Sequence, residues 1–264
     1  MSGMFDIDVY LKTLAYEGPR TPTVDTLREL HKRHLMTIPY DSSLNSGRGT
    51  SLWAGVDIDQ DTTFDAVVAG GRGGVCYELN GLFSALLRGL GHQTGVFAAG
   101  IRQADGTFGP DLEHVFGFAR VEGDIWLTDV GFVGPSYLEP LRLAVGEVTT
   151  QSGTDFRIVL ADGYHVVQRK GRTGDWQAVY RFRPEPRSYA EWGVPSSELD
   201  RFARQLSGAG TVVRGRAFDR GQRILIGKRL VTVDDGHESM RGVVDPDDYA
   251  QVLADILGRP AGAS

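Results

Sequence analysis

The side chains in this chain that could support covalent catalysis are one cysteine, six histidines and a set of acids. The cysteine, Cys76, follows two glycines and directly precedes an apolar pattern with helical spacing. A thiol at the start of a helix faces the positive end of the helix dipole, which favours the thiolate. Free cysteines are also often small buried hydrophobes, so the neighbouring residues must decide between nucleophile and core.

A cysteine nucleophile needs a base, and the base needs an acid that orients it. His114 begins an apolar strand predicted over residues 114–121, and Asp129 lies near the end of the next, predicted over residues 125–130. A tight turn at residues 122–124 joins the two strands, which brings His114 and Asp129 onto neighbouring strands of a hairpin. A carboxylate in an apolar strand needs a dedicated partner. The pattern therefore predicts Cys76, His114 and Asp129 as one site.

The remaining histidines have simpler interpretations. His31 and His34 lie on an amphipathic helical pattern and are interpreted as surface or half-buried residues. His92 ends a helix, where a capping role is expected. His165 begins a strand that has no acid nearby, and His237 lies in a polar turn.

The elements that must position these residues follow the order helices, strands, then a mixed region. Helical spacing runs through residues 9–35 and 79–90, and period-two alternation begins near residue 94. Short strands at regular spacing favour a small antiparallel sheet or barrel. A connector follows at residues 184–195, and further predicted elements are a helix over 197–206, strands over 224–226 and 230–233, and a helix over 245–257. The order indicates an α+β chain of about three subdomains.

Composition narrows the function classes. The chain has 264 residues and a net charge of −6, without the basic face expected of a nucleic-acid binder. No apolar run is long enough for a membrane span, and the N-terminus does not resemble a secretory signal. With one cysteine and no export signal, we expect a cytoplasmic protein. No metal, Walker or Rossmann motif is present, so any reaction must use side chains and a co-substrate.

Three segments resemble the arylamine N-acetyltransferase family. They are Arg-Gly-Gly-Val-Cys-Tyr-Glu-Leu-Asn-Gly-Leu-Phe at residues 72–83, His114, and Trp-Leu-Thr-Asp-Val-Gly-Phe at residues 126–132. The resemblance extends to Ile-Pro at residues 38–39 and covers most of the first 140 residues. It implies a helical bundle over 1–92, an antiparallel β-barrel over 93–183, and a connector with an α/β lid over 184–264. It also carries the family's Cys-His-Asp triad over to Cys76, His114 and Asp129.

The family resemblance implies ping-pong acyl transfer without a bound cofactor or metal. The Cys76 thiolate attacks an acyl thioester, and an aromatic amine then attacks the acyl-enzyme. Asp129 holds the imidazole of His114, and backbone N–H groups near Cys76 face the developing oxyanion.

The chain departs from the family after the second predicted helix. Pro-Tyr-Asp at residues 39–41 replaces the usual Pro-Phe-Glu. We expect Asp41 to take the glutamate's supporting role and to pair with Arg72. Residues 103–114 and 131–141 resemble the ansamycin amide synthases, a branch that releases a polyketide from an assembly line by forming a macrolactam.

A macrolactam precursor requires a wide apolar pocket, and its donor is an acyl thioester on an acidic carrier domain. The aromatic residues expected to line the pocket are also typical of a packed core: Tyr40, Trp53, Phe108, Phe116, Phe132 and Tyr137. Carrier docking is expected at local basic regions, such as Arg142, residues 201–204 or residues 214–223, although each could equally be a solvated face.

Three other functions remain open. The first is an arylamine N-acetyltransferase that uses acetyl-CoA with the same triad. The second is a thiol hydrolase of the papain-like or transglutaminase-like kind, which shares the Cys-His-Asp order but lacks the Arg-Gly-Gly string. The third is a binding module with an unreactive thiol.

Overall fold

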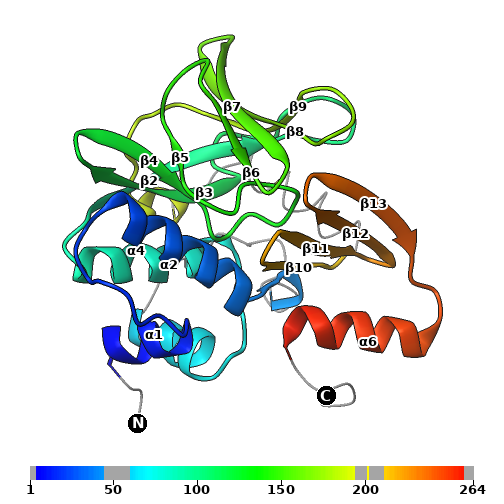
Figure 1. Ribbon diagram of the computed structural model, residues 1–264, viewed down its shortest axis with the longest axis horizontal. Helices are drawn as coiled ribbons and strands as arrows, with labels where there is room; N and C mark the ends of the chain where they lie inside the picture. Colours follow the sequence, from blue (N-terminus) through cyan, green and yellow to red (C-terminus); the bar gives the residue numbers. More distant parts are fainter. Residues whose placement is uncertain (1–3, 45–59, 194–200, 202–210, 259–264) are drawn as a thin grey trace.

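The computed structural model describes residues 4–44, 60–193, 201 and 211–258. Helices α1 to α4 lie on one side of a large sheet, and a second sheet with the last helix, α6, lies beside them (Figure 1). The arrangement is α+β, as predicted. No helix in the described part of the chain is long and apolar enough to span a membrane.

The helices begin where short polar side chains cap them. The Asp6 carboxylate accepts from the first amides of α1 (Ile7–Thr13), and the Thr23 hydroxyl accepts from Thr26 N–H in α2 (Val24–Thr37). A short helix, α3 (Gln60–Phe64), continues as a π-helical turn, η2 (Asp65–Ala69), and α4 spans Cys76–Gly89. Leucines and aromatic rings from α1, α2 and α4 form one buried core with the outer side of the neighbouring strands.

Eight antiparallel strands form a nearly closed barrel in the order β5-β4-β3-β2-β9-β8-β7-β6. The strands are β2 (Gln93–Ile101), β3 (His114–Val121), β4 (Asp124–Thr128), β5 (Leu141–Arg142), β6 (Val148–Gln151), β7 (Thr154–Ala161), β8 (Tyr164–Lys170) and β9 (Gln177–Phe182). The turn between β3 and β4 takes positive φ angles at Glu122 and Gly123, the backbone that suits a tight hairpin. Alternate aromatic and aliphatic side chains fill the interior.

The second sheet has the order β1-β10-β11-β12-β13. Four of its strands are consecutive: β10 (Val213–Phe218), β11 (Gly221–Ile226), β12 (Arg229–Asp234) and β13 (His237–Gly242). Its edge strand, β1 (Tyr40–Asp41), comes from the segment after α2, with Tyr40 opposite Gly215. Helix α6 (Pro246–Leu257) packs Val252 and Ile256 against this sheet.

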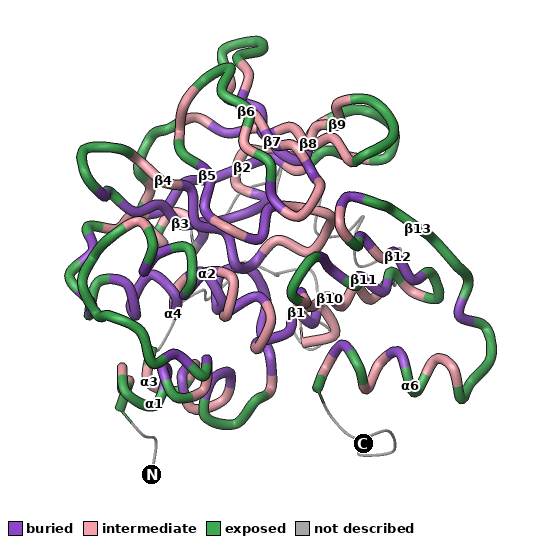
Figure 2. The backbone as a smooth tube through the Cα atoms, in the orientation of Figure 1, coloured by how far each residue is buried: buried purple, intermediate pink, exposed green. Residues whose placement is uncertain are grey.

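Several elements differ from the sequence-based expectation. β1, β10 and β13 were not predicted. Every residue of β13 is exposed (Figure 2), so it carries no apolar alternation that a pattern could detect. The helix predicted over 197–206 lies outside the described residues except for Arg201. The domain boundaries at 92/93 and 183/184 stay predictions.

Candidate active site

The turn that leads into α4 is built from two glycines and a capping acid. Gly73 has φ +80°, and a Cβ on it would lie 2.7 Å from the Pro39 carbonyl oxygen. Gly74 N–H donates to that carbonyl at 3.1 Å. The Glu78 carboxylate accepts from Val75 N–H at 3.1 Å and pairs with Arg72 at 2.7 Å. These contacts explain the Arg-Gly-Gly-Val-Cys-Tyr-Glu spacing.

Cys76 is the first residue of α4, and its side chain is buried beside Tyr40, Val115 and Trp192. The segment after β4 packs directly on its backbone, because a Cβ on Gly131 would lie 2.7 Å from both Cys76 Cα and the Cys76 carbonyl oxygen. Position 131 therefore accepts only glycine at this approach.

His114 and Asp129 meet inside the protein. The Asp129 Oδ2 atom lies 2.7 Å from His114 Nε2, and both side chains are at most 2% exposed. The Cys76 side chain also acts on this imidazole and raises its pKa, and because Nε2 bonds Asp129, Nδ1 is the nitrogen left for the thiol. The structure thus brings the three predicted residues together in the order thiol, imidazole, carboxylate.

Opposing effects act on the pKa of His114. Burial lowers this pKa, but the charge and hydrogen bond of Asp129 raise it, and so does Cys76. The net pKa is about 10, so the imidazole is held as the cation when the thiol has given up its proton.

Asn80 supports the carboxylate, and sequence reasoning assigned it no separate role. It lies one helical turn after Cys76 and is buried. Its amide Nδ2 donates to Asp129 Oδ1 at 3.2 Å and to the Val115 carbonyl at 2.9 Å, and its Oδ1 accepts from Val130 N–H at 3.0 Å. Its place four residues after the cysteine was the available signal.

The structure corrects the interpretation of His31 and His34. Both lie on α2, and both are completely buried rather than at the surface. His34 Nδ1 lies 3.3 Å from the Tyr10 hydroxyl, and His31 lies against the backbone at Asp129. Burial lowers the pKa of His31 to about 4 and that of His34 to about 3.

The structure also gives the predicted supporting residues different partners. Arg72 pairs with Glu78, as described above. Asp41 lies 3.1 Å from the Nε atom of Arg214 on β10, and its carboxylate accepts from the Ser43 hydroxyl and N–H. Asp41 therefore joins β1 to the C-terminal sheet, and Glu78 takes the position expected for an acid beside Arg72.

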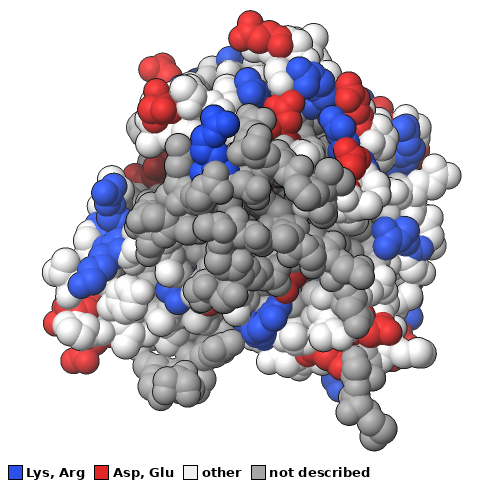
Figure 3. Space-filling model, turned by 180° about the vertical axis from the view of Figure 1, so that it is seen from behind, with Lys and Arg blue, Asp and Glu red and all other residues white. Residues whose placement is uncertain are grey.

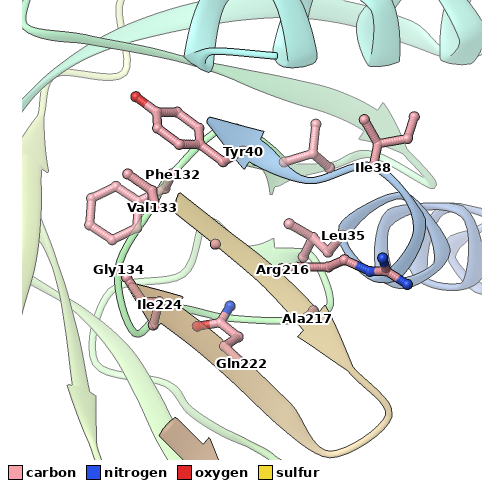
Figure 4. Close-up of a pocket in the computed structure, with 12 residues that line it drawn as sticks. Leu35, Ile38, Tyr40, Phe132, Val133, Gly134, Arg216, Ala217, Gln222 and Ile224 are labelled. Carbon is pink, nitrogen blue, oxygen red and sulfur yellow. The ribbon is translucent and has the colours of Figure 1, made fainter. Parts of the chain in front are cut away.

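A narrow pocket lies where α2, the segment after β4 and the C-terminal sheet meet (Figure 4), and it is not lined by Cys76, His114 or Asp129. Tyr40 enters it from β1, and Phe132 from the segment after β4. The Phe132 ring meets the His114 ring edge-on at 5.7 Å. The other lining residues are Leu35, Ile38, Val130, Val133, Gly134, Gly215, Arg216, Ala217, Gln222 and Ile224.

The other aromatic residues predicted for the pocket lie elsewhere. Phe116 and Tyr137 are buried in the barrel, where the Phe116 ring stacks on His114 at 6.1 Å. Phe108 lies over the Arg181 guanidinium. Arg181 neighbours the inward-facing Tyr180 on β9, so Phe108 is on the outer face of the barrel wall. Trp53 lies outside the described residues.

Comparisons with known proteins identify the family of this chain. A family model described as N-acetyltransferase matches residues 23–259, nearly the whole chain. The chain belongs to the arylamine N-acetyltransferase family. Among curated relatives, it is 36% identical to "Proansamycin X synthase" from Amycolatopsis mediterranei, over 98% of this chain and 99% of the relative. It is 30% identical to an arylamine N-acetyltransferase from Mycobacterium tuberculosis, over 77% of this chain and 74% of the relative.

Solved structures of the family share the fold. The arylamine N-acetyltransferase of M. tuberculosis matches with a TM-score of 0.78 at 25% identity, covering 97% of this chain and 94% of that one. The enzyme from Nocardia farcinica matches with a TM-score of 0.77 at 27% identity, covering 98% and 92%. Within the described residues of this family member, no three His, Cys, Asp or Glu side chains are grouped as a metal site would require.

Proposed function

We propose that this chain is an amide synthase that closes a polyketide macrolactam of the ansamycin type through an acyl-enzyme on Cys76. The observation that carries the proposal is the 36% identity to "Proansamycin X synthase", which extends over essentially both chains. The 30% match to the M. tuberculosis acetyltransferase covers only about three quarters of each chain. We also place the enzyme in the cytoplasm, because its single cysteine fits a reducing compartment.

The first half-reaction loads the enzyme. His114 Nδ1 takes the proton of the Cys76 thiol, and the thiolate attacks the carbonyl carbon of the polyketide thioester. Backbone N–H groups of the first turn of α4 stabilise the oxyanion. The bond to the donor sulfur then breaks, and the leaving thiolate takes the proton from the imidazolium. Asp129 stabilises the imidazolium throughout this step.

The second half-reaction releases the product. The aromatic amine at the other end of the same acyl chain attacks the thioester on Cys76. An aromatic amine is already a free base near pH 7, so His114 acts on the proton that the nitrogen loses after attack. The C–S bond to Cys76 breaks, the lactam leaves, and the proton returns to the thiolate–imidazole pair. The balance requires no water, oxidant or cofactor.

The proposed donor is carried by an acyl carrier domain, which is usually acidic. Of the basic regions that the sequence suggested for docking, residues 202–204 lie outside the described residues, and most of the other arginines lie beside acids. Arg142 lies beside Asp124 and Glu147, and Arg223 lies 3.9 Å from Asp255. Basic and acidic side chains are interspersed on the face in Figure 3. We therefore expect carrier affinity to depend on the acyl chain and its pantetheine arm more than on surface charge.

A second candidate is an acetyl-CoA-dependent arylamine N-acetyltransferase. It is favoured by the family match itself and by the acetyltransferase structures that share the fold. It uses the same triad, with a free arylamine as acceptor.

Mass spectrometry of the intact protein tests the shared first step. The wild-type protein mixed with an acyl thioester should gain the acyl mass on Cys76, and Cys76→Ser should gain none, because a serine hydroxyl is a far poorer nucleophile. An unmodified wild-type protein would instead favour a binding module.

Two substrates separate the candidate enzymes. The first is acetyl-CoA with aniline. The second is a pantetheine thioester of a long acyl chain that ends in an aminoaryl group, and its control is the same thioester without the amino group. Formation of a lactam from the aminoaryl thioester supports the proposal. Efficient acetylation of aniline without lactam formation overturns it, and rapid hydrolysis of the amine-free control would identify a thiol hydrolase.

A further inference from the structure

A buried histidine on α2 contacts the backbone on both sides of the segment that follows β4. His31 Nδ1 lies 2.8 Å from the carbonyl oxygen of Leu138, and its Nε2 lies 3.1 Å from the amide nitrogen of Asp129. The imidazole is completely buried, between the rings of Phe83 and Tyr137.

The two backbone partners fix the proton on this ring. A carbonyl oxygen can only accept, so Nδ1 of His31 must carry the hydrogen and donate it to Leu138. A backbone N–H can only donate, so Nε2 must be the bare nitrogen that accepts from Asp129. Burial keeps the ring neutral, with its pKa lowered to about 4, so both hydrogen bonds form at once near pH 7.

The segment that His31 holds at both ends carries much of the site. It begins at Asp129, and Gly131 packs on the backbone of Cys76. Phe132 packs on the imidazole of His114. At the far end, Gln151 of β6 accepts from the Leu138 N–H at 2.9 Å, so His31 completes a second anchor there.

We propose that His31 is a positioning residue, whose hydrogen bond from the Asp129 amide sets the carboxylate in place for His114. The other groups that hold Asp129 are Asn80 and the Gly131 N–H, and both act on the carboxylate Oδ1. His31 alone among these contacts fixes the main chain of Asp129. The inference rests on the proposed role of the Cys76–His114–Asp129 triad.

Two amide variants separate the two hydrogen bonds of His31. The amide of Gln reaches the place of Nε2, so His31→Gln can still accept from Asp129 N–H. The amide of Asn reaches the place of Nδ1, so His31→Asn keeps the bond to Leu138 and loses the one to Asp129. We expect His31→Asn to slow acylation by about 10- to 100-fold, as a displacement near 1 Å does. His31→Gln should stay close to the wild-type rate.

The direct readout is the rate of Cys76 alkylation by iodoacetamide as a function of pH, which needs no knowledge of the substrate. Cys76 is the only cysteine, so the signal reports that thiol alone. In His31→Asn the profile should move to higher pH, because a displaced Asp129 stabilises the imidazolium less. A purely structural role would change the yield of folded protein without moving the profile of the folded fraction.

His34 is the matched control, since it is equally buried on the same helix and bonds to Tyr10 instead of Asp129. His34→Asn and His34→Gln should keep the wild-type alkylation profile. The inference is overturned if His31→Asn keeps that profile, or if His31→Gln loses it as fully as His31→Asn. A wild-type thiol no more reactive than that of His114→Asn would overturn the triad itself.

Discussion

Burial alone would leave the imidazole of His114 neutral, because a charged ring loses its hydration inside the protein. Asp129 reverses that preference at a distance of 2.7 Å, and the pKa of His114 rises to about 10. The charge on the ring therefore depends on one carboxylate and on the groups that hold it.

Asp129→Asn is expected to reduce acylation on the order of a thousandfold or more, as the equivalent change does in serine proteases. An amide NH₂ facing Nε2 would place the ring proton on Nδ1, which could then no longer accept the proton of Cys76. Single-turnover acylation rates measure the loss. Asp162→Asn, in the exposed turn between β7 and β8, is the matched control and should react at the wild-type rate.

The sequence was sufficient to predict the three residues that the structure brings together, but not the residues that hold them in place. Patterns identify these three residues because each is unusual in its place. Cys76 is the only cysteine, and His114 and Asp129 are polar residues at the ends of apolar strand patterns. Asn80 and His31 bond to groups on other elements, and only Asn80, four residues after Cys76, had a spacing that could have indicated its role. An amphipathic pattern also cannot separate a surface histidine from a buried one.

At the scale of elements, α2 carries two neutral buried histidines, and they make the free energy of unfolding depend on pH. The pKa of His34 falls from 6.5 in the unfolded chain to about 3, and that of His31 falls to about 4. Between pH 6.5 and 4 the unfolded chain binds protons that these folded side chains do not. Both histidines therefore lower the free energy of unfolding as the pH falls.

His34→Gln should remove one of these two contributions. The free energy of unfolding of the variant should be below that of wild type at pH 6. This difference should shrink by about 1.4 kcal/mol for each pH unit as the pH falls from 6 to 4. Urea unfolding at several pH values measures this difference. Glu113, whose pKa is raised to about 7 by burial, acts in the opposite direction but equally in both proteins.

His237 is exposed, and His237→Gln is the control for that series. Its free energy of unfolding should change with pH in the same way as that of wild type. A deficit for His34→Gln that stays constant with pH would show that His34 is not held neutral in the folded protein.

Elements with strong periodicity were predicted well, and short or exposed ones were not. Helix α4 has apolar residues at helical spacing, and β3 and β4 are apolar strands on either side of a tight turn. β1 has two residues, too few for any alternation, and β13 is exposed on both faces. β1 also pairs with β10, a strand far away in the chain, and local patterns do not record such a partner.

At the scale of the whole molecule, β1 links the helices to the C-terminal sheet. Its pairing with β10 is accompanied by the Asp41–Arg214 ion pair, whose side chains are only 9% and 15% exposed. The pocket lined by Tyr40 and Phe132 lies at this junction, so its shape depends on the link.

Asp41→Ala should lower the free energy of unfolding by about 3 kcal/mol, because it leaves a largely buried arginine without its acid. Urea denaturation measures the change. Asp234→Ala removes an exposed ion pair with Arg220 in the same sheet and should cost less than about 1 kcal/mol. Equal losses in the two variants would contradict a structural role for the Asp41 link.

The pairing of position 40 with position 215 also has a consequence for synthesis. β1 leaves the ribosome early, but its partner strand does not exist until most of the chain has been translated. During that interval the wall of the pocket formed by β10 and β11 is missing. Contacts between residues so far apart form slowly. The nascent chain thus lacks part of the pocket wall until β10 and β11 have been translated, and the pocket is completed only near the end of translation.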